Sequence, residues 1–275
     1  MGLISQNIPS PEFGSIPTPS LNTLPRAHAI TQGCTGVYSV RLTELVLGVN
    51  RDTDVRPAYS DTRMNALALT LSTERIGTYL KNAKGDPCEA IRLYEQNTAL
   101  SESLYSVLQG LEVSVRNAMH RTLAEGFGRF DWYKVVKLST SESERVQDAM
   151  DTIARNNKTL TPDRMVSELT FGFWVAILTK HYAPELWIPH LHRAFPHKAL
   201  GHQTVHQRLN KIRFLRNRVA HHECILNRDL ESDYCEIIEA LGWICPETSA
   251  WIRETTRFEK SFQELFGRKI IIIQR

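Results

Sequence analysis

An apolar repeat in the middle of the chain most constrains the fold. Six apolar residues recur at steps of three and four positions: Leu100, Leu104, Leu108, Leu111, Val115 and Met119. A helix with 3.6 residues per turn places such residues on one face, so they predict a long amphipathic helix. Gly126-Phe127-Gly128 predicts its end. No convincing alternation of period two appears in the body of the chain. The sequence therefore predicts an all-α bundle of about six or seven helices.

Shorter stretches predict where other helices begin. Ser72 is placed to cap a helix that runs to Tyr79 or Leu80. Ser141-Glu142-Ser143-Glu144 is a capping-box pattern before a second helix. Thr161-Pro162-Asp163 predicts the start of a third, with proline in its first turn. Its apolar stripe comprises Met165, Leu169, Phe173 and Ala176. We expect the aromatic residues of this stretch in the core rather than stacked on bases: Phe171, Phe173 and Trp174.

The two ends of the chain differ from the helical part. Residues 1–63 are rich in Ser, Thr and Asn and are interrupted by Pro9, Pro11, Pro17, Pro19 and Pro25, which predicts a disordered or loosely attached extension; a docking tail is the alternative. We expect the helical domain over residues 64–267 and a C-terminal tail over 268–275. Ile270–Ile273 is either a short β-like tail or an apolar clasp.

Composition excludes several classes of protein. With 42% hydrophobic and 23% charged residues, the chain has the balance of a globular protein. Its longest apolar runs are far shorter than the ~20 residues that span a bilayer, so we expect no membrane partner. Its cysteines are five, scattered and without a C-x-x-C pair, which favours a reducing cytoplasm over a disulfide framework. His202 and His206 have a spacing that suits a metal, but no H-E-x-x-H motif accompanies them. We therefore expect neither metal nor cofactor.

Residue types suited to catalysis or RNA binding are concentrated in Arg208–Glu223, which reads RLNKIRFLRNRVAHHE. At 100° per residue, one face of this segment is apolar: Val205, Leu209, Ile212, Leu215 and Val219. Five basic residues and no acidic one stand between positions 208 and 218. A helix here would bury one side and present cations and imidazole on the other, the groups needed to cut RNA without a metal. The alternative is a solvated basic face with an accidental histidine pair.

Arg216-Asn217-Arg218-Val219-Ala220-His221 resembles the Arg-polar-x-x-x-His motif of HEPN ribonucleases. The longer string LRNRVAHHECIL resembles the Abi-like (abortive infection) branch of that superfamily, although Cys224 stands where proline is frequent. Four further segments resemble Abi-like segments and occur in the same order as in that family, over roughly residues 64–265. They are Leu71–Leu80, Leu93–Asn117, Glu168–Trp174 and Trp243–Trp251.

This resemblance implies a HEPN-type endoribonuclease that cuts RNA by attack of the 2′-hydroxyl. It implies products with a 2′,3′-cyclic phosphate and a 5′-hydroxyl. It also implies a toxin-like effector in phage defence or in a toxin–antitoxin pair, with a neutralising antitoxin or an activating phage component as partner. The family pairs two motifs across a dimer interface. Because this chain has one full motif, we expect a homodimer through residues 208–223.

The residue types suggest roles for the motif. His221 is the candidate acid and base, because imidazole exchanges protons near neutral pH. Arg216 is the candidate phosphate clamp, because guanidinium stays charged and binds oxygens in a fork. Five residues apart, the two lie ~140° from each other on an ideal helix. Asn217 shares a face with His221 and is expected to orient its imidazole.

Other polar residues are expected to bind RNA. The primary set comprises Arg208, Lys211, Arg213, Arg218 and His222. Arg116 and Asn117 are secondary, because Arg116–His120 resembles a shortened second motif. They either contact RNA or support the His221 helix; alternatively, Arg116 simply pairs with Glu112 one turn away. Glu223 is expected to pair with a basic neighbour.

Two other function classes compete with the nuclease. One is a non-catalytic RNA-binding or protein-interaction module of the same fold. The intact Arg216 and His221 argue against it, because a retired site tends to lose one or both. The other is a metalloprotein built on the histidine-rich stretch, which is the weakest.

Overall fold

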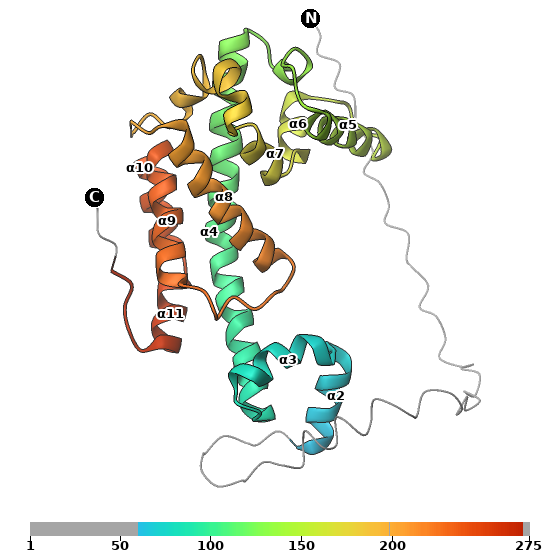
Figure 1. Cartoon of the computed structure of the whole chain (residues 1–275), viewed down its shortest axis with the longest axis vertical. Helices are drawn as coiled ribbons and strands as arrows, with labels where there is room; N and C mark the ends of the chain where they lie inside the picture. The colour runs from blue at the N-terminus through green and yellow to red at the C-terminus, as the bar shows by residue number, and fades with distance from the viewer. Residues whose placement is uncertain (1–59, 198, 272–275) are drawn as a thin grey trace, which may run out of the picture. The chain divides into compact units, whose positions relative to one another are not determined.

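The computed structural model describes residues 60–197 and 199–271 (Figure 1). Within these ranges every regular element is helical, in ten α-helices and four short 3-10 or π segments. The all-α prediction is confirmed, but the expected six or seven helices are too few. The predicted extension over residues 1–63 lies outside the described residues except at its end, where α2 (Asp61–Leu71) begins.

Helix α4 (Pro87–Phe127) is the predicted long helix, and most of the other helices lie along it (Figure 1). All six residues of the predicted stripe are buried, with exposed fractions of 3% or less. Asp86 caps its start by accepting hydrogen bonds from the backbone N–H groups of Cys88 and Glu89, at 2.9 and 3.2 Å. Gly128 ends the helix at a positive φ of 65°, which glycine adopts without strain. Helices α3, α7, α8, α9, α10 and α11 all contact α4.

Helices α2 and α3 (Thr73–Asn82) cover the first turns of α4. One small cluster joins Met64, Ile76 and Ile91. A second joins Tyr79, Ala83 and Ala90. Ser72 caps α3 as predicted, with its Oγ accepting from the N–H of Arg75 at 3.3 Å. This part of the chain has its own apolar contacts beside the main core.

Helices α5 (Thr140–Arg155), α6 (Pro162–Glu168) and α7 (Phe171–Ala176) differ in detail from the predictions. The N-cap of α5 is Ser139 rather than Ser141, and its hydroxyl donates to Glu142 in the first turn. The third predicted helix starts at Pro162 but divides at Leu169 and Thr170, whose ψ angles of 120° and 158° are extended. The break frees the carbonyl of Leu169 to accept the indole N–H of Trp174, at 3.3 Å.

The aromatic residues of this region lie in the core, as expected. Phe171, Phe173 and Trp174 have exposed fractions of 2% or less. The less periodic stretches form η1 (Trp132–Lys134), η2 (Lys180–Tyr182), η3 (Ala183–Trp187) and η4 (Leu191–Ala194).

The C-terminal part consists of α8 (His202–Ala220), α9 (Leu230–Ile244), α10 (Pro246–Thr255) and α11 (Phe258–Phe266). Helix α8 packs on α4, α7 and α9. In the tail, Ile270 is buried against the core and Ile271 is exposed, neither in a strand; Ile272 and Ile273 lie outside the described residues. No helix in the described ranges is both long and apolar enough to cross a bilayer.

Candidate functional site

His221 is exposed to solvent at the C-terminal end of α8. The predicted apolar face of α8 is buried throughout, with exposed fractions of 5% or less. His221 is the C-cap residue and is exposed. His222 follows at a left-handed φ of 56°, and the N–H of Glu223 donates to the carbonyl of Arg218 at 2.8 Å. This closing turn is a Schellman motif, which defines the direction in which the chain leaves the helix.

The segment 222–227, which follows His221, is held by side chains from α3 and α4. Asn97 of α4 is only 4% exposed. Its Nδ2 donates to the carbonyl of Glu223 at 3.3 Å, and its Oδ1 accepts from the N–H of Ile225 at 2.8 Å. Arg75 of α3 donates from Nη1 to the carbonyl of His222, at 2.5 Å. The backbone beside His221 is therefore held from two helices.

Sequence reasoning missed Asn97, although a signal was present. Asn97 stands three positions before Leu100 and so continues the register of the α4 stripe. A polar residue in a buried stripe must satisfy its hydrogen bonds within the protein, which marks it as a structural or functional contact.

We expect Asn97→Ala to lower the free energy of unfolding by about 2–3 kcal/mol, because it leaves the buried N–H of Ile225 and the carbonyl of Glu223 without their partner. Urea unfolding followed by circular dichroism measures the change. Thr98→Ala, at the exposed neighbouring position, is the control and is expected to change stability by less than about 1 kcal/mol. Equal midpoints for the two variants would show that Asn97 does not hold the segment.

Arg216 points from α8 towards α4. Its Nε lies 3.1 Å from Oε2 of Glu112, whose side chain is 17% exposed. The Arg216 side chain is 38% exposed, and no hydrogen bond from either Nη reaches another described residue. Likewise, no hydrogen bond or ion pair in the described chain joins Arg216 to His221. Arg216 is thus bound to α4, while His221 is exposed at the end of α8.

Asn217 is half-buried and contributes to a surface depression beside α8. The depression is lined by Lys211, Phe214, Asn217, Arg218, Glu223 and Arg228. Asn217 accepts the N–H of His221 with its backbone carbonyl, at 2.9 Å. Among the described residues its side chain forms no hydrogen bond to His221, so the expected orienting bond is not seen.

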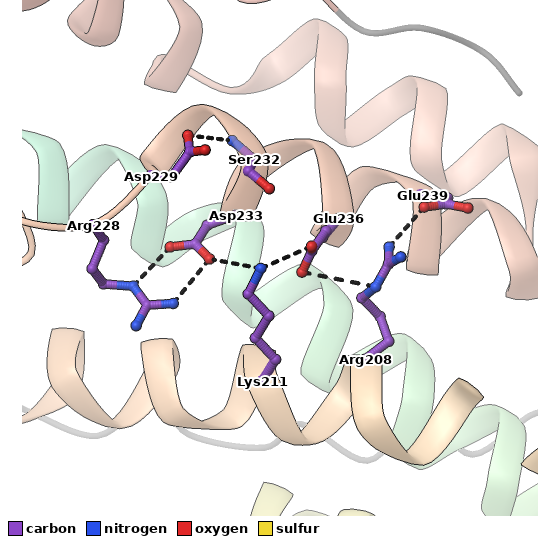
Figure 2. A network of polar contacts seen from close by, with 8 residues as sticks. All are labelled: Arg208, Lys211, Arg228, Asp229, Ser232, Asp233, Glu236 and Glu239. Atoms are coloured by element: carbon purple, nitrogen blue, oxygen red, sulfur yellow. Dashed lines mark hydrogen bonds and ion pairs between the residues drawn. The ribbon is translucent and has the colours of Figure 1, made fainter. Parts of the chain in front are cut away.

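Two basic residues predicted to bind RNA, Arg208 and Lys211, join Arg228 in an ion-pair network with α9 (Figure 2). Arg208 lies 2.7 Å from Glu239, and Lys211 lies 2.8 Å from Glu236. Arg228 makes two bonds to Asp233, at 2.7 and 2.9 Å. Lys211 also approaches Asp233, at 3.8 Å. These contacts join α8, α9 and the segment before α9, so the charges of Arg208 and Lys211 are largely compensated within the chain. RNA contact by them stays a prediction.

The remaining cations of α8 have different surroundings. Arg218 pairs with Glu223 at 3.2 Å, the basic neighbour expected for Glu223. Arg213 donates from Nε and Nη2 to Oδ1 of Asn210, at 3.1 and 2.9 Å, and lies 4.5 Å from the ring centre of Phe214. His222 is exposed and lines a groove against α4.

The shortened second motif is mainly structural at His120. Its Nδ1 accepts the indole N–H of Trp132 at 3.1 Å, and burial lowers the pKa of the imidazole, which favours the neutral form. The alternative considered for Arg116, a pair with Glu112, is not seen among the described residues, where Glu112 binds Arg216. The Nε of Arg116 is buried without a hydrogen-bond partner in the described structure, while Asn117 is exposed.

In the described ranges, no group of three or more His, Cys, Asp or Glu side chains is placed to hold a metal ion. Burial lowers the pKa of His206, and the neighbouring His202 and Arg213 lower it further. Comparisons with models of protein families, with curated proteins and with solved structures give no significant match.

Proposed function

We propose that this chain is a metal-independent endoribonuclease of the HEPN type with His221 as its acid and base. The observation that carries the proposal is an exposed imidazole at the C-terminal end of a basic helix, on a backbone held by Asn97 and Arg75. A proton-transfer group must be accessible to its substrate, and the exposed imidazole meets this requirement at the start of a backbone segment that is held in place.

The reaction needs two proton transfers. A neutral imidazole accepts the proton of the ribose 2′-hydroxyl, and the 2′-oxygen attacks the neighbouring phosphorus. The bond from phosphorus to the 5′-oxygen then breaks, and an imidazolium donates a proton to that oxygen. The products are a 2′,3′-cyclic phosphate and a 5′-hydroxyl. Charge on the five-coordinate phosphorus is stabilised by cations held beside it.

Arg216 supports the second part of this chemistry. Glu112 binds its Nε edge and so sets the direction of the guanidinium group. The Nη edge remains for two parallel hydrogen bonds to phosphate oxygens, the geometry in which arginine binds phosphate best.

We predict that Arg216→Lys lowers the rate of cleavage of bound RNA by about 10²-fold, while affinity for RNA falls only slightly. Lysine keeps the charge but cannot bind Glu112 and a phosphate through the same rigid fork. Single-turnover kinetics at saturating protein measure the rate, and fluorescence anisotropy measures the affinity. If affinity collapses while the rate on bound RNA is unchanged, Arg216 is a binding residue only.

A homodimer completes this site. In one copy, Arg216 lies against α4 while His221 is exposed beyond the helix end, and among the described residues no hydrogen bond joins the two side chains. A two-fold axis beside α8 would add a second histidine and a second arginine around one phosphate. Phe214 is 54% exposed and lies about two helical turns before His221, which provides an apolar centre for an interface over residues 208–223.

We expect a mixture of Arg216→Ala and His221→Ala proteins to recover part of the activity that each variant lacks, provided that subunits exchange. The heterodimer then contains one site with an arginine from one copy and a histidine from the other. Labelled-RNA cleavage measures recovery, and sedimentation velocity measures the dimer. A fully active protein that sediments as a monomer at assay concentration would contradict the arrangement.

A non-catalytic RNA-binding or interaction module is the second candidate, and one observation favours it: the charge of Arg216 is already met by Glu112. Incubation of 5′-labelled RNA in EDTA separates the candidates. The nuclease yields fragments that end in a 2′,3′-cyclic phosphate, and the module leaves the RNA intact. A toxin-like role in phage defence or in a toxin–antitoxin pair rests on the sequence resemblance, and growth arrest on induction, absent with His221→Ala, would support it.

A further inference from the structure

A groove of about 280 Å³ lies between α4 and the C-terminal end of α8. Four residues of α4 line one side of it: Tyr94, Thr98, Glu102 and Tyr105. They recur at steps of four, four and three positions, so they form one stripe along the helix. Val219 and His222 line the other side. Pockets for drug-sized ligands have volumes of roughly 300–1,000 Å³, so this groove suits a ring system of the size of one nucleobase.

The α4 side of the groove has an aromatic residue at each end. Tyr105 is 56% exposed, and among the described residues no ring contact or side-chain hydrogen bond involves it. Tyr94 packs edge-on against Tyr79, with ring centres 5.3 Å apart, so it forms a fixed wall. Unpaired bases of RNA stack on exposed aromatic faces of this kind. Tyr105 is therefore the surface of the groove that is suited to stacking.

Glu102 lies between the two tyrosines and decides which part of RNA fits the groove. Its side chain is exposed, and in the described ranges no hydrogen bond or ion pair involves it. An ionised carboxylate repels a phosphate, so the groove is unsuited to the RNA backbone. Its two oxygens accept two parallel hydrogen bonds, which requires a base that presents two neighbouring donors. Guanine does so on its Watson–Crick edge, whereas uracil presents one donor between two carbonyl groups.

We propose that this groove binds an unpaired guanine of the RNA substrate, with Tyr105 stacked on the base and Glu102 accepting from its Watson–Crick edge. That edge is accessible only when the base is not paired, so the substrate class is single-stranded RNA. His221 and His222 are consecutive, with Cα atoms about 3.8 Å apart, so the bound base belongs to a nucleotide close to the phosphate at His221. This connection to cleavage rests on the proposed function, but binding of the base is measured separately.

The experiment uses a 5′-fluorescein RNA of ten nucleotides with one guanine among uridines. Every 2′-hydroxyl is methylated, so the RNA has no nucleophile and is not cut. Fluorescence anisotropy with the full chain gives its Kd. We expect Tyr105→Ala to bind about tenfold more weakly, the loss of one stacked base. Tyr105→Phe keeps the ring and is expected to bind as the wild type does, whereas Tyr105→Leu is expected to resemble Tyr105→Ala.

A second comparison tests Glu102. The wild type is expected to bind the guanine-containing RNA about tenfold more tightly than an all-uridine RNA, because two hydrogen bonds to a carboxylate form only with guanine. Glu102→Gln is expected to abolish this preference, since an amide accepts only one bond from guanine and also bonds uracil. The ratio of the two Kd values is the readout, so the general effect of removing a negative charge cancels.

Two controls accompany these variants. Phe130→Ala removes another aromatic residue, 67% exposed and beyond the far end of α4, and is expected to bind as the wild type does. Annealing the RNA to a complementary strand pairs the guanine and is expected to remove the difference between Tyr105→Ala and the wild type. Circular dichroism verifies that all variants fold.

Unchanged binding by Tyr105→Ala, or an equal loss in Tyr105→Phe, would overturn the stacking assignment. Equal Kd values of the wild type for the two RNAs would overturn the assignment of guanine. If these results fail while the wild type still cleaves ordinary RNA in EDTA, the nuclease proposal stands without this base site. If the tyrosine and glutamate variants behave as expected but no RNA is cleaved, the groove is the base site of a non-catalytic RNA-binding module.

Discussion

His221→Ala is expected to lower the rate of RNA cleavage by about 10³-fold, the contribution of a positioned acid–base group. Because His221 is exposed at the end of α8 and lies outside the buried face, its removal should leave the fold unchanged. We expect the free energy of unfolding to change by less than about 0.5 kcal/mol. Cleavage of labelled RNA in EDTA and thermal unfolding by circular dichroism test the two statements together.

His197→Ala serves as the matched control, since it removes another exposed histidine that precedes α8 and lies 24 positions before His221. It is expected to retain full activity and stability. Wild-type cleavage by purified His221→Ala protein would remove His221 from the mechanism. A large loss of stability in the same variant would instead assign His221 to the fold.

Asp233→Ala is expected to lower the free energy of unfolding by about 3–5 kcal/mol. Asp233 is 4% exposed and accepts both bonds from Arg228, and Lys211 lies 3.8 Å away (Figure 2). Its removal leaves the Arg228 guanidinium partly buried without its carboxylate, which is the costly way to break an ion pair. Guanidinium chloride unfolding measures the effect.

The matched control is Glu264→Ala. Glu264 pairs with Lys260 at 3.8 Å on the surface of α11, where both side chains are largely exposed. Solvent screening makes such a pair worth less than about 1 kcal/mol. If both variants unfold at the same denaturant concentration, the network of Figure 2 contributes no more than an ordinary surface pair.

The helices with the strongest apolar periodicity were predictable from sequence. The stripe of α4 and the buried face of α8 follow from spacing alone, because burial of a helix face depends on a period of 3.6 residues. The break at Leu169 was not predictable in this way. The apolar spacing continues through it, and the break is accompanied by a hydrogen bond from the indole of Trp174 to the freed carbonyl.

The candidate site was predictable in its residue types but not in its partners. The basic residues of α8 are visible in the sequence, yet Glu112 lies 104 residues before Arg216 and Glu236 lies 25 residues after Lys211. Which carboxylate meets which cation depends on how the helices pack.

The length of α4 has a consequence for the kinetics of local opening. Its 41 residues extend over about 60 Å, and its first turns contact α2 and α3 while its middle lies in the main core. Amide hydrogens in the middle of α4 should exchange with solvent only through global unfolding, whereas those near Ile91 should exchange through the smaller opening of α2 and α3. Asn97 lies between the part of α4 that contacts α2 and α3 and the part in the main core. Heating should therefore separate the segment beside His221 from Asn97 before the helical core melts. Activity should be lost at this earlier step.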